Sequence, residues 1–279
     1  MEELGLTGDI CRLAGSSGGA IMALTVALGY SSSDIEKVLR ETDMSDFKDG
    51  SYTMLGKAYD LIFHLGLYKG NAFLKWLGDL ITAKGFDVDI TFRQLREKTG
   101  KDLIITGSNL NRRAVEIYSV DTSPDMEVRK AVRISMSIPL FFQPVKVDTL
   151  DGTALMVDGG LLNNYAIGIF DKHGCPCKCV MSETLGFKLL SDGEQEDSQI
   201  FHGFDKLDSV SKVVKSIVEN LMMQIERLYI KPNYWERTVA IQTHGVSATD
   251  FNLSDSTKDL LVQWGYDSCC NYFNPSTNP

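Results

Sequence analysis

The sequence lacks a hydrophobic run long enough to cross a bilayer. Its longest apolar stretch, AIMALTVALGY at residues 20–30, covers 11 residues, whereas a membrane-spanning helix needs about 20. The first ten residues, MEELGLTGDI, carry acidic side chains and no apolar core, unlike a secretory signal, which begins with positive charge. These absences predict a soluble protein that is made in the cytoplasm.

Positive charge is also scarce. The chain has 28 Lys and Arg against 37 Asp and Glu, which gives a formal net charge of −9. A protein with this balance repels nucleic-acid phosphates as a whole, so we expect no nucleic-acid partner. No repeat, low-complexity tract or Pro/Gly-rich linker divides the 279 residues. With 43% hydrophobic residues, the chain has the composition of an ordinary globular protein.

The sequence has few signals for a metal or a cofactor. Its six cysteines are Cys11, Cys175, Cys177, Cys179, Cys269 and Cys270. The C-x-C-x-C run at 175–179 has His173 nearby but no second ligand pair at zinc-site spacing. Reduced thiols are therefore favoured over a metal site. We expect neither a metal nor a cofactor.

Apolar strand patterns alternate with helical ones along the chain, which favours an α/β layer structure with a largely parallel sheet. The expected strands cover 9–15, 101–110, 113–120, 153–160, 177–186 and 237–245. The expected helices cover 18–29, 31–42, 71–85, 91–100, 126–138, 207–230 and 254–273. Asp34 or a neighbouring serine, and Thr91, are expected to cap two of these helices.

The segment RLAGSSGGAIMAL contains the pattern G-x-S-x-G at Gly15–Gly19, with Ser17 at its centre. A serine between a strand and a helix sits on a strained turn that presents its hydroxyl outward, and flanking glycines avoid collisions with that turn. The other interpretations are a plain turn or a phosphate-binding loop. Neither Gly-Lys-Ser/Thr nor G-x-G-x-x-G is present. From this pentapeptide alone, a nucleophile and a plain turn are equally favoured.

A serine nucleophile needs a base that removes its proton. The four histidines are His64, His173, His202 and His244. The order Ser17, Asp158, His244 matches the triad of α/β-hydrolases, but only 16 residues precede Ser17, too few for the strands that come first in that fold. Asp158 is the better base, since it ends the strand TALMVDGG and is followed by Gly159 and Gly160.

Together these motifs resemble the patatin-like phospholipase family, whose members are related to cytosolic phospholipase A2 in using a Ser–Asp dyad without histidine. Its G-x-S-x-G motif falls on Gly15–Gly19, including Gly18, and its D-G-A/G motif falls on Asp158–Gly160. The flanking segments AVRISMSIPLFFQPV (131–145) and GVSATDFNLSDSTKDLLVQWGY (245–266) are also similar to the family. The resemblance covers roughly residues 9–273.

The resemblance implies a single domain over 1–279, with three layers and a mostly parallel sheet flanked by helices. It implies that Ser17 attacks a lipid or phospholipid ester and forms an acyl-enzyme, while Asp158 accepts the proton and later activates water. The alternative for Asp158 is a structural role, in which its side chain caps the turn. The resemblance also implies a cytoplasmic enzyme that makes peripheral contact with membranes. No catalytic role is assigned to Asn109 or Arg133.

The sequence departs from the family at its start. The family begins with a strand and a G-G-G-x-R/K-G loop whose N–H groups form the oxyanion hole, and residues 1–9 match only the end of the helix that follows. We therefore expect the first strand to be missing, as in a truncated gene model or splice product, or in a natural pseudoenzyme. Losing one oxyanion donor typically slows acyl transfer by about 10²–10³. The alternative is thus a catalytically weak or inactive patatin-like protein that binds lipid or has a regulatory role. In transcript sequencing, an in-frame stop directly upstream of Met1, with no G-G-G-x-R/K-G encoded there, would contradict the truncation.

Two further segments have apolar or aromatic character. LYIKPNYWER at 228–237 clusters aromatic and basic residues, which makes it the better candidate for contact with a lipid interface, although aromatics also close cores. The apolar stripe of the expected helix at 207–230 is favoured as core packing over membrane contact.

Overall fold

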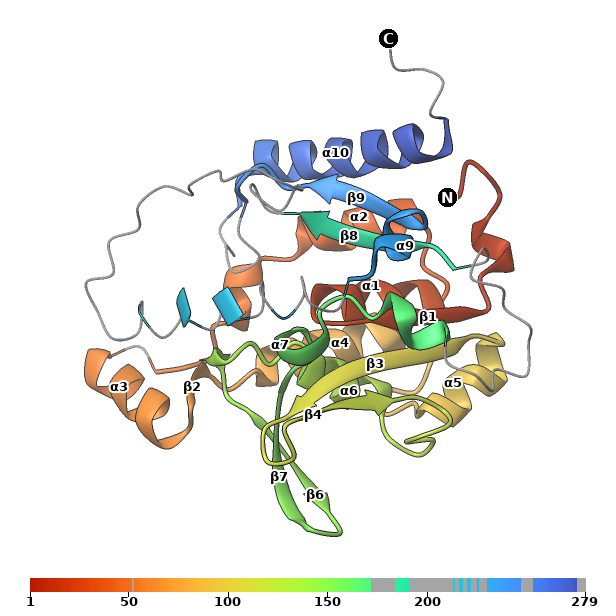
Figure 1. Cartoon of the computed structure of the whole chain (residues 1–279). Coiled ribbons are helices and arrows are strands. Elements are labelled where there is room, and N and C mark those ends of the chain that lie inside the picture. The colour runs from red at the N-terminus through yellow and green to blue at the C-terminus, as the bar shows by residue number, and fades with distance from the viewer. Residues whose placement is uncertain are drawn as a thin grey trace.

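The computed structural model describes residues 1–51, 53–171, 184–190, 230–246 and 253–274, together with residues 213, 216, 217, 220, 221 and 225. Its centre is a five-stranded sheet with helices packed against it (Figure 1). The strands of this sheet are β1 (Arg12–Gly15), β3 (Asp102–Asn109), β4 (Ala114–Tyr118), β6 (Val145–Thr149) and β7 (Gly152–Asp158). The fold is therefore α/β, as the sequence predicts.

Strand β3 organises the sheet. Its residue Ile105 pairs with both Gly15 of β1 and Tyr118 of β4, so β1 and β4 lie on opposite edges of β3. Strand β7 pairs with Gly107–Asn109 of β3, and the other edge of these same residues pairs with β4. Strand β7 therefore lies on the same edge of β3 as β1. Strands β1 and β7 thus lie end to end along one edge of β3, and Thr106 is level with the gap between them.

The sheet is mixed rather than mostly parallel. In the part of the chain that the structure describes, β1 runs parallel to β3, whereas the pairings β3–β4, β3–β7 and β6–β7 are antiparallel. The reason is the β6–β7 hairpin, which returns the chain toward β3 in the opposite direction. Two smaller parallel pairs are β2 (Gly66–Tyr68) with β5 (Leu140–Phe142), and β8 (Gly186–Leu190) with β9 (Thr238–Gln242).

The helices begin and end where their capping residues predict. Ser31 and Asp34 form a reciprocal capping box at the start of α2, and Thr91 caps α5, which ends at the left-handed Gly100. The helices are α1 (Gly18–Ala27), α2 (Ser32–Glu41), α3 (Met54–Phe63), α4 (Asn71–Ala83), α5 (Phe92–Thr99), α6 (Val128–Ser135), α7 (Gly160–Asn163), α9 (Pro232–Trp235) and α10 (Asp255–Phe273). Short 3₁₀ helices cover Thr7–Asp9, Met44–Phe47 and Ile167–Phe170.

The main core lies between the sheet and helices α1, α4 and α6. Leu24, Phe73, Ile105, Ile134 and Met156 are almost fully buried in one cluster. Helix α1 is apolar around most of its circumference because it is covered by β1, β3 and α6. Burial of this large apolar cluster is the main stabilising term that holds the strand ends of the site in place.

Some expected elements have different bounds. Helix α6 ends at Ser135, before the residues that precede Pro139, because 136–142 form a connection and then β5. Helix α3 was not expected. The expected strand at 177–186 lies mostly outside the described residues, and β8 begins at Gly186. The expected helix at 207–230 also lies outside them, apart from isolated positions. No helix in the described ranges is long and apolar enough to span a membrane.

Candidate active site

The two motif residues come together where β1 and β7 meet. Ser17 follows the end of β1 and Asp158 ends β7, directly opposite Gly107 of β3. The Ser17 Oγ donates a hydrogen bond to Asp158 Oδ2 at 2.7 Å. This distance is within the range at which a carboxylate can accept a proton from a hydroxyl.

The backbone of Ser17 occupies a region that L-residues rarely adopt. Its φ is 51° and its ψ is −127°, which costs on the order of 1–3 kcal/mol unless the surroundings enforce it. Three contacts enforce it here. The Ser17 N–H donates to Ser135 Oγ at 2.9 Å, and the first turn of α1 closes through Gly19 N to Ser16 O and Ala20 N to Ser17 O. The turn therefore keeps the Ser17 side chain at the helix start, partly exposed.

The motif glycines do not contribute equally to this turn. A Cβ on Gly15 would lie 2.2 Å from the carbonyl oxygen of Gly19, and a Cβ on Gly159 would lie 2.4 Å from the carbonyl oxygen of Thr106. Neither neighbour can move, because both are backbone atoms of the site. A Cβ on Gly18 or Gly19 would meet no atom within 4 Å. The collision expected for a side chain at a motif glycine is therefore found at Gly15, which precedes Ser17, and not at Gly18 or Gly19, which follow it.

Ser16 has a structural role that distinguishes it from Ser17. Its Oγ is buried, donates to the Asn163 carbonyl at 3.0 Å, and lies 2.6 Å from Thr106 Oγ1. These contacts tie the turn to β3 and to α7. Of the two serines, only Ser17 directs its hydroxyl to the carboxylate.

Asp158 is fully buried. Burial raises the pKa of its carboxyl group to about 7, although hydrogen bonds from Ser17 Oγ and from the Gly160 N–H favour the ionised form. The Gly160 contact is 2.7 Å to Oδ1, so each carboxylate oxygen has one donor. A carboxyl group with a pKa near neutrality can take up and release a proton under physiological conditions.

The segment 135–137 contacts both motif residues, and the sequence did not assign it a role. Besides the Ser135 contact, the Ser137 carbonyl accepts from Asp158 N at 2.9 Å, and Met136 Sδ lies 3.7 Å from Ser17 Oγ. The sequence signal that could have identified this segment is the pair of serines in Ser-Met-Ser, which lies at the end of a helix shortly before Pro139. Thr106 had a similar signal, a polar residue in the middle of a buried strand.

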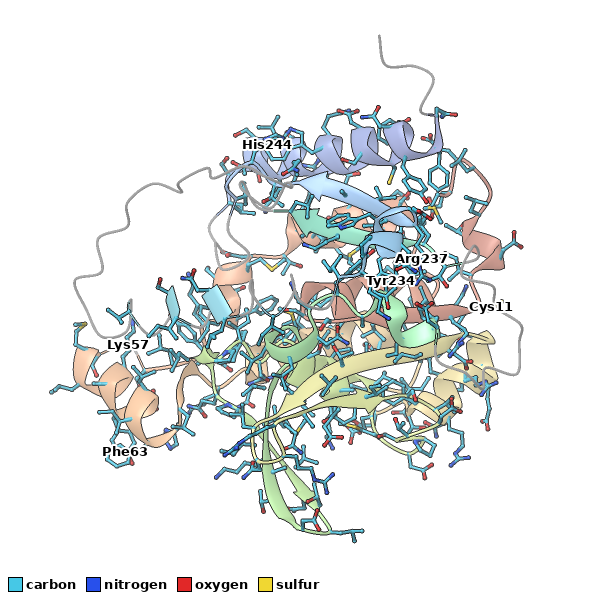
Figure 2. All side chains as sticks on the ribbon, viewed as in Figure 1. Cys11, Lys57, Phe63, Tyr234, Arg237 and His244 are labelled. Carbon is cyan, nitrogen blue, oxygen red and sulfur yellow. The ribbon has the colours of Figure 1, made fainter. Side chains whose placement is uncertain are left out.

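The structure gives no support to a histidine triad. The His64 ring contacts Asp60 at 3.1 Å, and the His244 ring packs on Trp264 beside α10 (Figure 2). Within the described ranges, no histidine contacts Ser17 or Asp158. His173 and His202 lie outside those ranges.

Arg133 is a buried structural residue. Its guanidinium group donates to the carbonyls of Lys69, Gly70 and Gln143 and contacts Ser137 Oγ, thereby joining β2, β5 and the end of α6. Burial lowers the pKa of Arg133 to about 10. Asn109 shapes the β3–β4 turn, since its Oδ1 accepts from the backbone N–H groups that follow.

Other candidate groups lie elsewhere or outside the description. Among the described residues, no cluster of three acidic, histidine or cysteine side chains could hold a metal. The cysteines at 175–179 are not among them. In the segment 228–237, Tyr234 and Arg237 are buried against each other rather than displayed (Figure 2). In the same segment Lys231 and Trp235 are exposed, so contact of the segment with a lipid interface stays a prediction.

Comparison with known proteins identifies the family. A family model described as patatin-like phospholipase matches residues 6–171, which include both motif residues and more than half of the chain. The uncharacterized protein YqhO of Bacillus subtilis (strain 168) is 32% identical over 265 residues, covering 91% of this chain and 84% of YqhO. The chain belongs to the patatin-like phospholipase family.

Two further similarities cover a smaller share of the matched protein. A protein of Invertebrate iridescent virus 6 named probable lipid hydrolase 463L is 30% identical over 167 residues, covering 59% of this chain and 54% of the viral protein. The crystal structure of VipD from Legionella pneumophila matches 98% of this chain with a TM-score of 0.57 and 17% identity. The chain spans 63% of the length of VipD, and the likeness is one of fold.

Proposed function

We propose that the protein is a serine hydrolase of lipid acyl esters that uses Ser17 as nucleophile and Asp158 as general base. The observation that carries this proposal is the 2.7 Å hydrogen bond from Ser17 Oγ to Asp158 Oδ2 on a strained strand–helix turn. Membership of a phospholipase family and the name of the viral relative support a lipid or phospholipid ester as substrate.

In this mechanism the ionised Asp158 removes the Ser17 proton as Oγ attacks the ester carbonyl. The tetrahedral intermediate expels the alcohol, which takes the proton from Asp158, and leaves an acyl-enzyme. Asp158 then deprotonates a water molecule that attacks the acyl-enzyme, and the second tetrahedral intermediate releases the carboxylic acid as the Ser17 oxygen takes the proton back from Asp158. One carboxylate therefore acts as base and acid in both halves of the reaction.

The developing oxyanion needs hydrogen-bond donors. Gly18 is the first residue of α1, where backbone N–H groups have no acceptor within the helix. The next two N–H groups, of Gly19 and Ala20, already donate to Ser16 and Ser17. Gly18 N–H can therefore supply one donor, and the positive end of α1 favours negative charge at the same position.

A fluorophosphonate probe tests the proposal, because it labels activated serines. The wild-type protein should be labelled and should hydrolyse a phospholipid ester, and Ser17→Ala should abolish both. Ser16→Ala is the matched control, since it removes the neighbouring hydroxyl and should leave labelling detectable. An unlabelled wild type that still binds liposomes would instead favour the lipid-binding alternative.

A further inference from the structure

Two side chains contact the Ser17 hydroxyl, and the second is the thioether of Met136. The Met136 Sδ lies 3.7 Å from Ser17 Oγ, while the hydroxyl donates to Asp158 Oδ2 at 2.7 Å. Because a thioether sulfur is a weak acceptor, the carboxylate holds the single hydrogen of the hydroxyl. A change that made the Met136 side chain a strong acceptor would therefore compete with Asp158 for that hydrogen.

The position of Met136 is fixed by the backbone around it. Met136 is the C-cap of α6, and its N–H donates to carbonyls of the last turn of that helix. The preceding residue, Ser135, accepts a hydrogen bond from the Ser17 N–H through its side chain. The following residue, Ser137, accepts from the Asp158 N–H through its carbonyl. The sulfur is thus held beside both motif residues and cannot move far without disturbing their turns.

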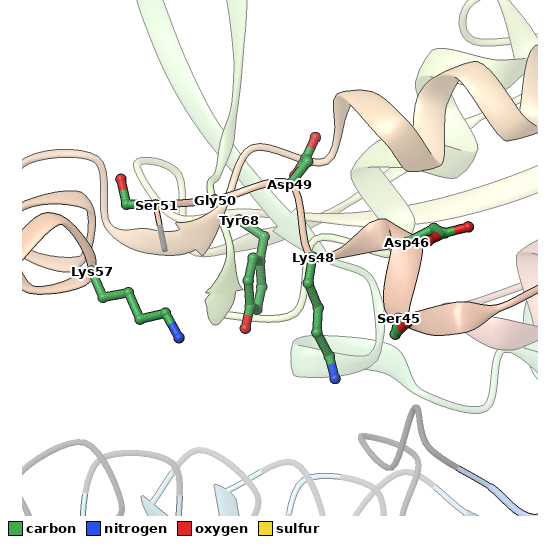
Figure 3. A pocket seen from close by; sticks show the side chains of 8 residues that line it. All are labelled: Ser45, Asp46, Lys48, Asp49, Gly50, Ser51, Lys57 and Tyr68. Atoms are coloured by element: carbon green, nitrogen blue, oxygen red, sulfur yellow. The ribbon is translucent and has the colours of Figure 1, made fainter. Parts of the chain in front are cut away.

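No cation assists Asp158 in holding the hydroxyl. Across the described part of the chain, no lysine or arginine side chain contacts Ser17 or Asp158. The buried Arg133 donates to backbone carbonyls of other elements. Lys48 and Lys57 extend into a separate cavity of about 430 Å³, whose lining includes neither motif residue (Figure 3). The dyad therefore depends on one hydrogen bond that a competing acceptor can break.

The sulfur of Met136 is accessible to a small oxidant. The residue is half-buried and packs against the core on one side, whereas Met156 inside the core is 1% exposed. Hydrogen peroxide converts a methionine thioether to a sulfoxide. The sulfur takes one oxygen atom from the peroxide and gives up two electrons, and the rest of the peroxide leaves as water. A partly exposed Ser17 hydroxyl that an ester can reach leaves room for a peroxide at the adjacent sulfur.

We propose that Met136 is an oxidation site whose sulfoxide inactivates Ser17. A sulfoxide turns the apolar end of the side chain into a polar group with a strong acceptor oxygen. Directed at Ser17, this oxygen shortens the 3.7 Å separation by one covalent bond and lies within hydrogen-bond distance of Oγ. The hydroxyl then turns from Asp158 to the sulfoxide, and the nucleophile loses its base. The role of Met136 rests on the proposed function, because it acts on Ser17 as the nucleophile.

Treatment of the full chain with hydrogen peroxide tests the proposal. The oxidised wild type should lose at least about tenfold in fluorophosphonate labelling and in hydrolysis of a water-soluble ester. The loss should persist in dithiothreitol, which reduces the disulfides and sulfenic acids of oxidised cysteines but leaves a methionine sulfoxide intact. Methionine sulfoxide reductases should restore the labelling of an oxidised sample that has not yet met the probe.

Met136→Leu is the decisive variant. It keeps an apolar side chain of similar size and removes the sulfur. Whatever its labelling before treatment, peroxide should leave that labelling unchanged. Met22→Leu is the matched control, because Met22 is 42% exposed on α1, the helix that follows Ser17. This control should be labelled like the wild type before treatment and should lose its labelling as the wild type does.

Peptide mass spectrometry locates the added oxygen in the oxidised wild type, which keeps the test independent of how the leucine variant folds. Loss of labelling should follow sulfoxide formation at Met136 and not at Met22 or Met54. Equal inactivation of Met136→Leu and the wild type, or full labelling of protein oxidised at Met136, would overturn the proposal. In both outcomes the untreated wild type is still labelled, so the hydrolase function stands. An untreated wild type that is neither labelled nor active would overturn the hydrolase function and the role of Met136 with it.

Discussion

The backbone N–H of Ser17 donates to the side-chain oxygen of Ser135, a residue 118 positions away in the chain. Ser135 is fully buried, and its own carbonyl accepts from Gly159 N, beside Asp158. One residue at the end of α6 therefore positions both the turn that bears the hydroxyl and the turn that bears the carboxylate.

Ser135→Ala should impair catalysis without removing a reacting group. The variant leaves the Ser17 N–H without its acceptor, which should lower the free energy of unfolding by about 1–3 kcal/mol. A displaced nucleophile should reduce kcat at least about tenfold and change KM little. Steady-state kinetics and urea denaturation measure the two effects.

Ser108→Ala is the control for that substitution. Ser108 is a fully buried serine of β3 whose hydroxyl has no partner among the described residues. Its removal should leave both kcat and the free energy of unfolding nearly unchanged. If Ser108→Ala and Ser135→Ala have equal effects, the Ser135 hydrogen bond has no positioning role.

The activity should depend on pH through Asp158. The base form is the ionised carboxylate, so kcat/KM should rise with pH and level off above an apparent pKa of about 7. Below that pH it should fall tenfold for each pH unit. A pH–rate profile with a soluble ester measures this, and His244→Ala should leave the midpoint where it is. A profile that shifts in the histidine variant would contradict the dyad.

The same carboxyl group should make stability depend on pH in the opposite sense to most aspartates. Its pKa is raised from 3.8 to about 7 in the folded protein, so the folded state binds the proton more tightly than the unfolded chain. Its stabilising contribution is fully present below about pH 4 and is lost as pH rises through about 7.

Asp158→Asn isolates that contribution. The amide cannot ionise, so above pH 7 the variant should unfold at higher urea concentration than the wild type, and near pH 5 the difference should shrink. The variant should also lose about 10²–10⁴-fold in kcat. Parallel denaturation curves for the two proteins over pH 5–9 show whether the difference changes with pH. A constant difference would mean that Asp158 is ionised throughout.

The glycines of the two motifs should differ in their tolerance to alanine. Gly15→Ala and Gly159→Ala place a methyl group 2.2–2.4 Å from backbone oxygens, which should destabilise the protein by about 1–3 kcal/mol and abolish probe labelling. Gly19→Ala meets no atom and lies in a helix. It should stabilise by about 0.4–1 kcal/mol. Thermal denaturation of the three variants measures the contrast.

Arg133→Lys should destabilise the protein although it keeps the charge. A lysine cannot donate in the planar fork that serves the carbonyls of Lys69, Gly70 and Gln143. We expect a loss of about 2–5 kcal/mol, measured by urea denaturation. Arg112→Lys is the control, because Arg112 forms an exposed ion pair with Asp151, and its change should stay within about 0.5 kcal/mol.

The sequence was informative where the cause of a structure is local. The caps at Ser31 and Thr91 and the strand–turn–helix around Ser17 follow from neighbouring residues, and the structure contains all of them. Asp158 was paired with Ser17 because it ends a strand and precedes two glycines, a pairing that the family resemblance also implies, and the structure places the two side chains in contact. The catalytic roles of both residues, and the expected truncation, stay predictions.

The rest depends on contacts that span the chain. The direction of β7 follows from a hairpin that returns to β3, whereas the alternation of strands and helices along the chain favoured parallel pairing. Ser135 meets Ser17 only after α6 packs on the sheet. Helix α3 could not be oriented from its pattern, since an apolar helical face usually indicates burial, and this one faces outward.

Because β1 and β7 meet end to end at the site, the register of β7 on β3 must be kept, whereas the length of the β6–β7 hairpin beyond the sheet can change. The turn of the β6–β7 hairpin lies between Thr149 and Gly152, at the opposite end of β7 from Asp158, and its residue Leu150 is fully exposed. A segment inserted at that tip would lengthen the hairpin outward and leave the carboxylate in register. One residue inserted within β7 would instead turn every later side chain to the other face of the sheet. The tip is therefore the place to graft a fluorophore, an affinity tag or a targeting peptide onto this enzyme fold.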